Sequence, residues 1–347
     1  MRPAPARLAA YEVVLRVFEQ DAYADRAFEA AAREHQLDQR DRALAQRIAF
    51  GAVQRRRTID HAIAQLARRP VEKLDPPVRA ALRIAAYQIG WLDQVPAYAA
   101  VHESVGLVRR ARLESAAGFA NAVGRRLSEG LRALVAALPE GTPQEAALRH
   151  SYPDWIAEAW WAEWGADEAL ALMRAQNEAP ETVVRLNGLK DIPAAVTARL
   201  GGQADPLIPG ALRVQVVDEA ALAAGLIRPQ SRASMLAGLA VAVRDGERVL
   251  DLCAAPGGKT TQLAQWAREV VAVEANPGRA RELADTCRLL GAANVVVREG
   301  DGRELPDEIG VFDRALVDAP CSGSGVYAYR PDLRWRSRPL PEQGAST

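Results

Sequence analysis

A glycine-rich segment and three later acids are the residues of this chain best suited to chemistry. The segment, Asp251 to Thr260 (DLCAAPGGKT), follows one apolar run and precedes a helical pattern. Glycines and small residues at such a position let a ligand approach backbone N–H groups at the start of a helix. Glu274, Asp301 and Asp318 each follow a further apolar run. Acids at the ends of successive strands, Asp251 included, predict one shared ligand site.

The loop pattern excludes the two common nucleotide-binding loops. A phosphate-binding loop needs G-x-x-x-x-G-K-[ST], and Gly258–Thr260 fit it, but Cys253 stands where the first glycine is required. The dinucleotide pattern G-x-G-x-x-G is absent there as well. Glu274 follows Asp251 by 23 residues, a spacing at which a carboxylate reaches ribose hydroxyls. These features favour an adenosine that carries a cationic group, such as S-adenosylmethionine.

Cys321 is the candidate reactive thiol among three cysteines. It follows the last apolar run in D-A-P-C-S-G, beside a carboxylate and near glycines, where a thiol can meet a substrate. A thiolate that adds to C6 of an unstacked pyrimidine makes C5 nucleophilic toward a methyl donor. Cys287 lies in a helical pattern, which is typical of packing. The cysteines form no C-x-x-C pair, so neither a disulfide framework nor a metal site is expected.

The elements upstream of this segment are mostly helical. To about residue 135, apolar residues recur at helical spacing and predict a bundle of five to seven helices. Glycines and prolines over residues 130–152 indicate a domain boundary. A helix from Asp154 to about Gln176 carries four of the seven tryptophans, which favours packing between domains over a surface that stacks bases. ETVVRLN and ALRVQVV then predict strands of a small α/β connector.

From residue 248, short apolar runs alternate with helical stretches. The runs are RVLDL, EVVAVEA, NVVVREG and DRALVDAP, and the first three are separated by TTQLAQWA and RARELADTCRLLG. This order predicts a doubly wound parallel sheet with ligands at the carboxyl ends of its strands. The expected fold class is therefore an all-α bundle followed by an α/β doubly wound, Rossmann-like domain.

Length and charge narrow the class of protein further. The chain has 347 residues, 49% of them hydrophobic, which excludes general disorder and allows two or three domains. The net charge is zero, but residues 1–150 hold 23 basic and 17 acidic residues, so a polyanion would bind there, although such an imbalance also arises by chance. In residues 1–150, the run Arg55–Arg57 either contacts RNA or forms a solvated helix end. Neither a signal peptide nor an apolar stretch of membrane-spanning length is evident, which predicts a cytoplasmic protein with no membrane partner.

Motifs in both halves of the chain resemble those of one family. DLCAAPGGKTTQLA, the acid in VAVEA, GDGRELP and DAPCSGSGV together resemble the RNA cytosine-C5 methyltransferases. DRALAQRIAFGAVQRRRTID, KLDPPVRAALRIAAYQIGWLDQVPAYAAVHESV and GFANAVGRRL resemble the NusB-like domain at the front of bacterial 16S rRNA (cytosine-C5) methyltransferases of the Sun/Fmu type. The resemblance implies a NusB-like RNA-binding domain over 1–138, a connector over 139–228 and the first part of a methyltransferase domain over 229–347.

The resemblance also implies an activity and a set of site residues. The activity is S-adenosylmethionine-dependent methylation of C5 of a cytosine in 16S rRNA, by a monomer without a metal. The stretch IRPQSRASML looks like the family's lead-in to the first strand of the domain and is expected to pack under the site. The residues that the resemblance assigns to the methyl donor are Cys253, Ala254, Ala255, Pro256, Gly257, Gly258, Lys259, Glu274, Asp301 and Asp318.

One departure from the family pattern concerns the nucleophile. In the family, a second cysteine in a Thr-Cys-Ser motif attacks C6, and the Pro-Cys cysteine, here Cys321, assists product release. This sequence has no Thr-Cys-Ser and continues after RPDLRWR as SRPLPEQGAST. The favoured hypothesis is a C-terminally truncated methyltransferase with an incomplete sheet. The alternatives are that Cys321 is the substitute nucleophile, as in DNA cytosine-C5 methyltransferases, or that the chain is a non-enzymatic, antitermination-like RNA-binding protein.

Overall fold

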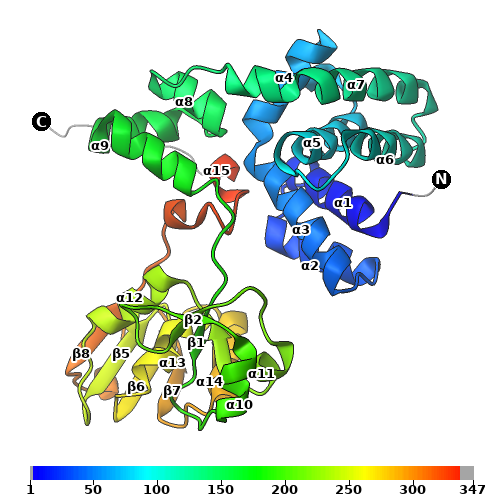
Figure 1. Cartoon of the computed structure of the whole chain (residues 1–347). Helices are drawn as coiled ribbons and strands as arrows, with labels where there is room; N and C mark the ends of the chain where they lie inside the picture. The colour runs from blue at the N-terminus through cyan, green and yellow to red at the C-terminus, as the bar shows by residue number, and fades with distance from the viewer. Residues whose placement is uncertain (1–2, 337–347) are drawn as a thin grey trace, which may run out of the picture. The chain divides into compact units, whose positions relative to one another are not determined.

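A computed structural model describes residues 3–336, which form two compact units (Figure 1). One unit is helical and contains residues 3–180 and 322–336. The other contains Glu181–Cys321 and is built on two sheets. The segment expected as a connector over 139–228 is thus divided between the units: its tryptophan helix belongs to the helical unit and its strands belong to the α/β unit. The three-part division stays a prediction.

Seven α-helices, within the range expected, make up the described residues before Ala137. They bury Ala, Val, Ile and Leu side chains in one shared core. None of the helices over residues 3–336 is long and apolar enough to cross a bilayer. The seven are α1 (Pro5–Glu19), α2 (Ala24–Glu34), α3 (Gln39–Gln54), α4 (Arg56–Ala67), α5 (Pro76–Trp91), α6 (Ala97–Arg110) and α7 (Glu114–Ala136).

The arginine run at the start of α4 is engaged inside the helical unit. The Arg57 guanidinium lies 2.7 Å from the Asp154 carboxylate and donates to the carbonyl oxygen of Tyr152 at 2.7 Å. Arg56 lies over the ring of Phe18 at 4.7 Å. These contacts favour a structural role for both arginines over the RNA contacts considered above.

Two further helices complete this part of the unit, α8 (Pro143–His150) and α9 (Asp154–Ala175). Pro153, and not the expected Asp154, is the N-cap of α9, and the helix kinks at Gly165, where φ is 79°. Trp160 is buried, with its ring centroid 5.3 Å from that of Tyr152 and 6.3 Å from that of Tyr327. Trp160 therefore packs inside the helical unit, against a segment from much later in the chain.

The last described segment of the chain contains an arginine that is buried in the helical unit. Arg334 lies in α15 (Leu333–Arg336), the red helix in Figure 1, which belongs to the helical unit, and its side chain is fully buried. Its guanidinium lies 4.1 Å from the centre of the Tyr152 ring and donates to the Ser151 carbonyl oxygen and to Asn177 Oδ1, each at 3.1 Å. Burial lowers the pKa of Arg334 to about 10. A buried cation needs acceptors and ring faces in place of its water. Here Nη1 has such acceptors and the guanidinium lies over a ring, whereas Nε and Nη2 have no hydrogen-bond partner among the described residues.

The α/β unit begins with a small antiparallel sheet of order β2-β3-β1-β4. Its strands are β1 (Val183–Leu186), β2 (Gln203–Ala204), β3 (Ala211–Arg213) and β4 (Ile227–Pro229). Three helices accompany this sheet and lead into the next, namely α10 (Ala194–Leu200), α11 (Glu219–Ala223) and α12 (Arg232–Ala240). Both strands expected in this region are therefore present.

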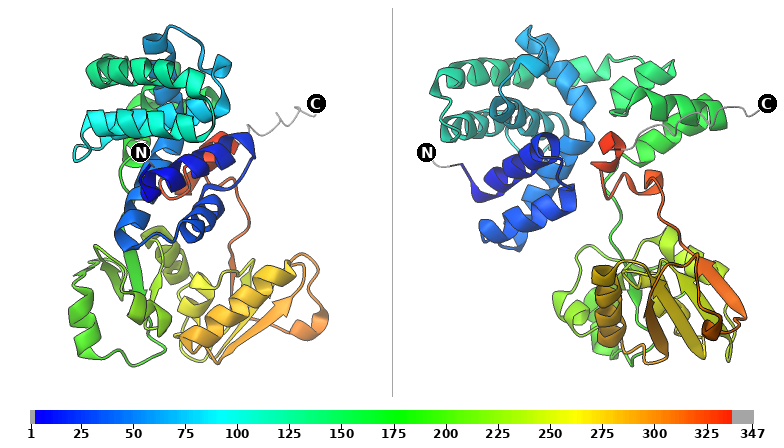
Figure 2. Two further views of the ribbon diagram at one scale, coloured as in Figure 1. Left: turned by 90° about the vertical axis from the view of Figure 1, so that its right-hand side faces the viewer. Right: turned by 180° about the vertical axis from the view of Figure 1, so that it is seen from behind.

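The second sheet is parallel, with order β7-β6-β5-β8 (Figure 2). Its elements are β5 (Arg248–Leu252), α13 (Gly258–Leu263), β6 (Glu269–Glu274), α14 (Pro277–Leu290), β7 (Val295–Glu299) and β8 (Arg314–Val317). Leu283 and Cys287 of α14 pack with Val249 and Val270 of the sheet in one buried cluster. Burial raises the pKa of the Cys287 thiol to about 11, as suits a packing cysteine.

Replacing the buried cation should destabilise the helical unit. Arg334→Met keeps much of the side-chain volume but leaves buried carbonyl acceptors without a donor, so we expect the free energy of unfolding to fall by about 3 kcal/mol. Urea denaturation followed by tryptophan fluorescence measures this change. Arg126→Met, on an exposed part of α7, is the matched control and should change stability by less than about 0.5 kcal/mol. Equal effects of the two substitutions would contradict the role given to Arg334.

Candidate active site

The four acids of the sequence pattern all lie at one edge of the parallel sheet. Asp251 is the penultimate residue of β5, Glu274 is the last residue of β6, and Asp301 and Asp318 follow β7 and β8. Since β5 pairs in parallel with β6 and β8, and β6 with β7, the carboxyl ends of the strands meet. The strand pairing thus brings together residues up to 67 positions apart in the sequence.

A cavity of about 210 Å³ opens at this edge, inside the α/β unit. Seven of the ten expected donor-binding residues line it, whereas Gly257, Glu274 and Asp301 do not. Cys321 is exposed and also lies outside the lining. The lining residues are Arg228, Pro229, Gln230, Ser231, Ser234, Asp251, Cys253, Ala254, Ala255, Pro256, Gly258, Lys259 and Asp318.

The loop between β5 and α13 depends on an unusual backbone conformation. Cys253 and Gly257 both have positive φ, 59° and 93°. A Cβ atom at Gly257 would lie 2.8 Å from the Leu283 side chain, so only glycine fits between the loop and α14. Gly257 therefore packs against α14, while its neighbours Pro256 and Gly258 line the cavity.

Asp251 is a buried carboxyl with one satisfied oxygen. Its Oδ2 accepts a hydrogen bond of 2.6 Å from the Thr260 hydroxyl, and the residue is 1% exposed. Its Oδ1 is also buried and has no hydrogen-bond partner among the described residues. Burial raises the pKa of Asp251 to about 6, because desolvation outweighs the hydrogen bond from Thr260. This acid can therefore be neutral or charged near neutral pH, depending on what approaches it.

Lys259 joins two of the loops at the cavity. Its Nζ lies 2.6 Å from Asp318 Oδ2, so the loop after β5 is bonded to the loop after β8. The Asp318 side chain is half exposed, which limits the contribution of this pair to stability. Its effect is to hold the two walls of the cavity at a set spacing.

Glu274 and Asp301 differ in their freedom to accept a ligand. Glu274 is 4% exposed, and its Oε1 accepts from the backbone N–H of Asn276 at 3.0 Å. Its Oε2 is buried with no hydrogen-bond partner among the described residues, and the Arg279 guanidinium lies 3.7 Å from it. Asp301 instead bonds to Arg303 of its own loop, at 2.6 Å. That side-chain bond, aided by the Arg303 backbone N–H, lowers the pKa of Asp301 to about 2.

A buried arginine that the sequence analysis did not single out supports the cavity wall. Arg185 of β1 is 3% exposed and donates to Gln230 Oε1 and to the Thr261 hydroxyl, each at 2.9 Å. Burial lowers its pKa to about 10. The small antiparallel sheet thereby holds the first turn of α13. The sequence signal that could have identified Arg185 is a charged residue within the otherwise apolar strand VVRL. Gln230 belongs to the lead-in segment expected to pack under the site, and it lines the cavity as well.

Comparison with known families accounts for both units. A family model described as 16S rRNA methyltransferase RsmB/F matches residues 238–341, and the NusB family model matches residues 4–129. The ferredoxin-like domain of RsmF/B-like methyltransferases matches residues 152–215. A relative from Thermus thermophilus named ribosomal RNA small subunit methyltransferase B is 34% identical over 98% of this chain and 76% of its own length. The chain belongs to this methyltransferase family.

Two further proteins also match nearly the whole chain. A relative from Synechocystis named probable ribosomal RNA small subunit methyltransferase B is 31% identical over 96% of this chain and 78% of its own length. The solved structure of a protein called PH0851 superposes with a TM-score of 0.73 at 25% identity, covering 98% of this chain and 79% of that one. The family resemblance and the expected fold class, a NusB-like helical region followed by an α/β methyltransferase domain, are confirmed.

The raised pKa of Asp251 makes stability depend on pH in a defined direction. Between its ordinary pKa of 3.8 and the folded value of about 6, the folded chain holds the Asp251 proton more tightly than the unfolded chain does. Stability is therefore lost as the pH rises through this window. Asp251→Asn removes that loss, so the stability of the variant relative to wild type should rise by about 2 kcal/mol between about pH 4 and pH 7.

Urea denaturation at both pH values measures this difference. Asp245→Asn, at an exposed position just before β5, serves as the control and should follow the wild-type profile. If the free energy of unfolding changed equally with pH in Asp251→Asn and in wild type, the carboxyl would not be buried as described.

Proposed function

We propose that this chain binds S-adenosylmethionine at the strand-end cavity and transfers its methyl group to C5 of a cytosine in 16S rRNA. One observation carries the proposal: Asp251 Oδ1, at the cavity, is a buried carboxylate oxygen with no hydrogen-bond partner among the described residues. Glu274 Oε2, at the same edge of the sheet, is also buried without a hydrogen bond and has the Arg279 guanidinium 3.7 Å away. Buried acceptors are costly unless a donor reaches them, so a ligand rich in donors and positive charge fits the site. Membership of a family of rRNA methyltransferases supports the same conclusion.

The proposed donor matches the chemistry of these residues. Glu274 would accept hydrogen bonds from the ribose hydroxyls, as its place at the end of β6 favours. Asp251 and Asp318 would stabilise the positive charge of the methionine end, and the loop Cys253–Lys259 would contact the ligand through its backbone. Asp301 can join the set at little cost, because its partner Arg303 is 87% exposed and such surface pairs are weak.

The bound donor would supply an electrophilic methyl group, and Cys321 is the thiol proposed to act on the base. As a substitute nucleophile, its thiolate would add to C6 of an unstacked cytosine and make C5 nucleophilic. After C5 takes the methyl group, loss of the C5 proton to a base expels the thiolate and restores the C5–C6 double bond. In the alternative role, assistance to product release, a different nucleophile makes the bond to C6. The exposed position of Cys321 suits contact with a large substrate in either role.

A labelled-methyl assay tests the proposed function. Incubation with unmodified small-subunit rRNA and methyl-labelled donor should place label on C5 of a cytosine. If Cys321 is the nucleophile, Cys321→Ser should abolish incorporation. Cys287→Ala is the matched control, because it removes a buried thiol outside the cavity and should leave transfer within about twofold of wild type.

Three results would change this account. Label that persists in Cys321→Ser excludes Cys321 as the nucleophile, and label on an atom other than C5 excludes the proposed reaction. If the chain retains rRNA with a steep salt dependence but neither binds donor nor transfers label, it is an RNA-binding protein without catalysis.

A further inference from the structure

A second hollow in the α/β unit, the β1–α13 hollow, has a volume of about 390 Å³. It is lined by the end of β1 and the loop after it, by Pro209 and Gly210, and by α13 and the turn after that helix. Volumes of roughly 300–1,000 Å³ are typical of small-molecule sites. The hollow shares no lining residue with the strand-end cavity, so the function proposed above does not use it.

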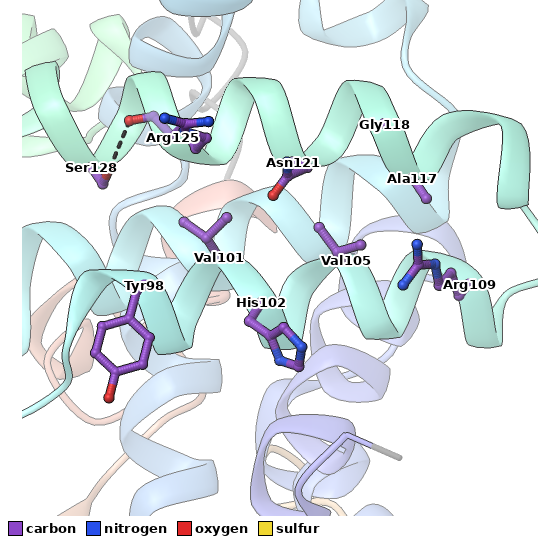
Figure 3. Close-up of a pocket in the computed structure, with 10 residues that line it drawn as sticks. All are labelled: Tyr98, Val101, His102, Val105, Arg109, Ala117, Gly118, Asn121, Arg125 and Ser128. Atoms are coloured by element: carbon purple, nitrogen blue, oxygen red, sulfur yellow. Dashed lines mark hydrogen bonds between the residues drawn. The ribbon is translucent and has the colours of Figure 1, made fainter. Parts of the chain in front are cut away.

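The hollow between α6 and α7 of the helical unit, shown in Figure 3, is larger, at about 580 Å³. Over residues 3–336, however, none of the residues that line it has a buried side-chain polar atom without a hydrogen-bond partner. The β1–α13 hollow is lined by two residues that do, Arg185 and Gln265. Because an unpaired buried donor is costly, the smaller hollow has the stronger chemical reason to bind a ligand.

Arg185 is a buried cation whose contacts are all neutral. It is 3% exposed, and its Nε and Nη2 donate to Gln230 Oε1 and to the Thr261 hydroxyl, each at 2.9 Å. Its Nη1 is buried and has no hydrogen-bond partner within the described ranges. Burial, and then the charge of Arg228, lower the pKa of Arg185 to about 10, and no described carboxylate raises it. A buried cation in this state would be stabilised by an anion that reaches Nη1.

Gln265 supplies a second unpaired donor. Its Nε2, an amide nitrogen with two N–H groups, is buried and has no hydrogen-bond partner in the described part of the chain. A neutral carbonyl compound could accept from Gln265 and Arg185 but would leave the charge of Arg185 without a counterion. An oxyanion would supply both the acceptors and the charge.

The rest of the lining favours a flat ligand with one negative charge. The Trp266 ring is 38% exposed and lines the hollow together with Ile192 and Pro209, so part of the lining is apolar. Lys190 and Asp191 also line it, and their charges cancel, which leaves the charge of the buried arginine. A monoanion would balance that charge, whereas a phosphate dianion would exceed it.

We propose that the β1–α13 hollow binds a small aromatic carboxylate. The carboxylate would accept hydrogen bonds from Arg185 Nη1 and Gln265 Nε2, and the ring would pack on Trp266. A planar carboxylate matches the planar fork of a guanidinium group. This inference goes beyond the proposed function and depends on neither the methyl donor nor the RNA.

Calorimetric titration of the full chain with benzoate tests the proposal. We expect saturable heat with one benzoate per chain. Benzamide has nearly the same shape but no charge, so it should bind at least about tenfold more weakly. Phenyl phosphate carries the same ring on a phosphate, and it should also bind more weakly than benzoate, because its second charge lies in a hollow that also holds Asp191.

Two variants test the residues assigned to the site. Gln265→Glu keeps the size of the side chain but replaces the unpaired donor with a negative charge, so it should weaken benzoate binding by at least about tenfold. Trp266→Ala removes the ring and should weaken it by about tenfold. Gln203→Glu is the matched control, because Gln203 is exposed on β2 and does not line the hollow, and it should change the affinity by less than about twofold. Thermal unfolding verifies that each variant is folded.

The results that would overturn the site are defined for each arm. Absence of saturable benzoate heat in wild type, equal affinities for benzoate and benzamide, or an unchanged benzoate affinity in Gln265→Glu would each contradict the proposal. Tighter binding of phenyl phosphate than of benzoate would show that the ligand is not a carboxylate.

Titration of the same chains with S-adenosylmethionine separates this inference from the proposed function. Gln265 does not line the strand-end cavity, so Gln265→Glu should keep the wild-type heat of donor binding. Loss of benzoate binding with donor binding kept supports the hollow as a site of its own. Absence of donor heat in wild type would contradict the proposed function alone.

Discussion

The parallel pairing of β5 with both β6 and β8 is the constraint on which the site depends. Together with the pairing of β6 and β7 it places the ends of four strands at one edge, where Asp251 and Asp318 line one cavity and Glu274 and Asp301 lie at the same edge. Two of these acids are almost fully buried, and each leaves one oxygen without a hydrogen-bond partner in the described structure. Their desolvation is a cost that a bound ligand would offset, which links the fold directly to ligand binding.

The parallel sheet does not build the cavity alone. Arg185 reaches from the small antiparallel sheet to Gln230 and Thr261, and the Lys259–Asp318 pair joins two of the strand-end loops. The chain that continues from Cys321 belongs to the helical unit, where Arg334 is buried. The loop that carries Cys321 therefore follows β8 in the chain and precedes a segment that packs within the helical unit.

Local sequence predicted most of the elements and the strand-end acids, because run length and helical spacing are local signals. It did not show that Arg185 supports the loop, that Asp301 bonds to Arg303, or that Arg334 packs on the Tyr152 ring. These features depend on contacts between distant residues, which no periodicity encodes. The arginine run at the start of α4 shows the same limit, since its partners lie elsewhere in the chain.

Calorimetric titration of the chain with S-adenosylmethionine tests the central claim, that the strand-end acids form a donor site. The account predicts saturable heat with one donor per chain, and an affinity about tenfold weaker in Glu274→Gln, which loses a charge-assisted acceptor at the proposed ribose position. Gln is close to Glu in size, so the fold should be kept. Absence of heat at millimolar donor, or unchanged affinity in Glu274→Gln, would contradict it.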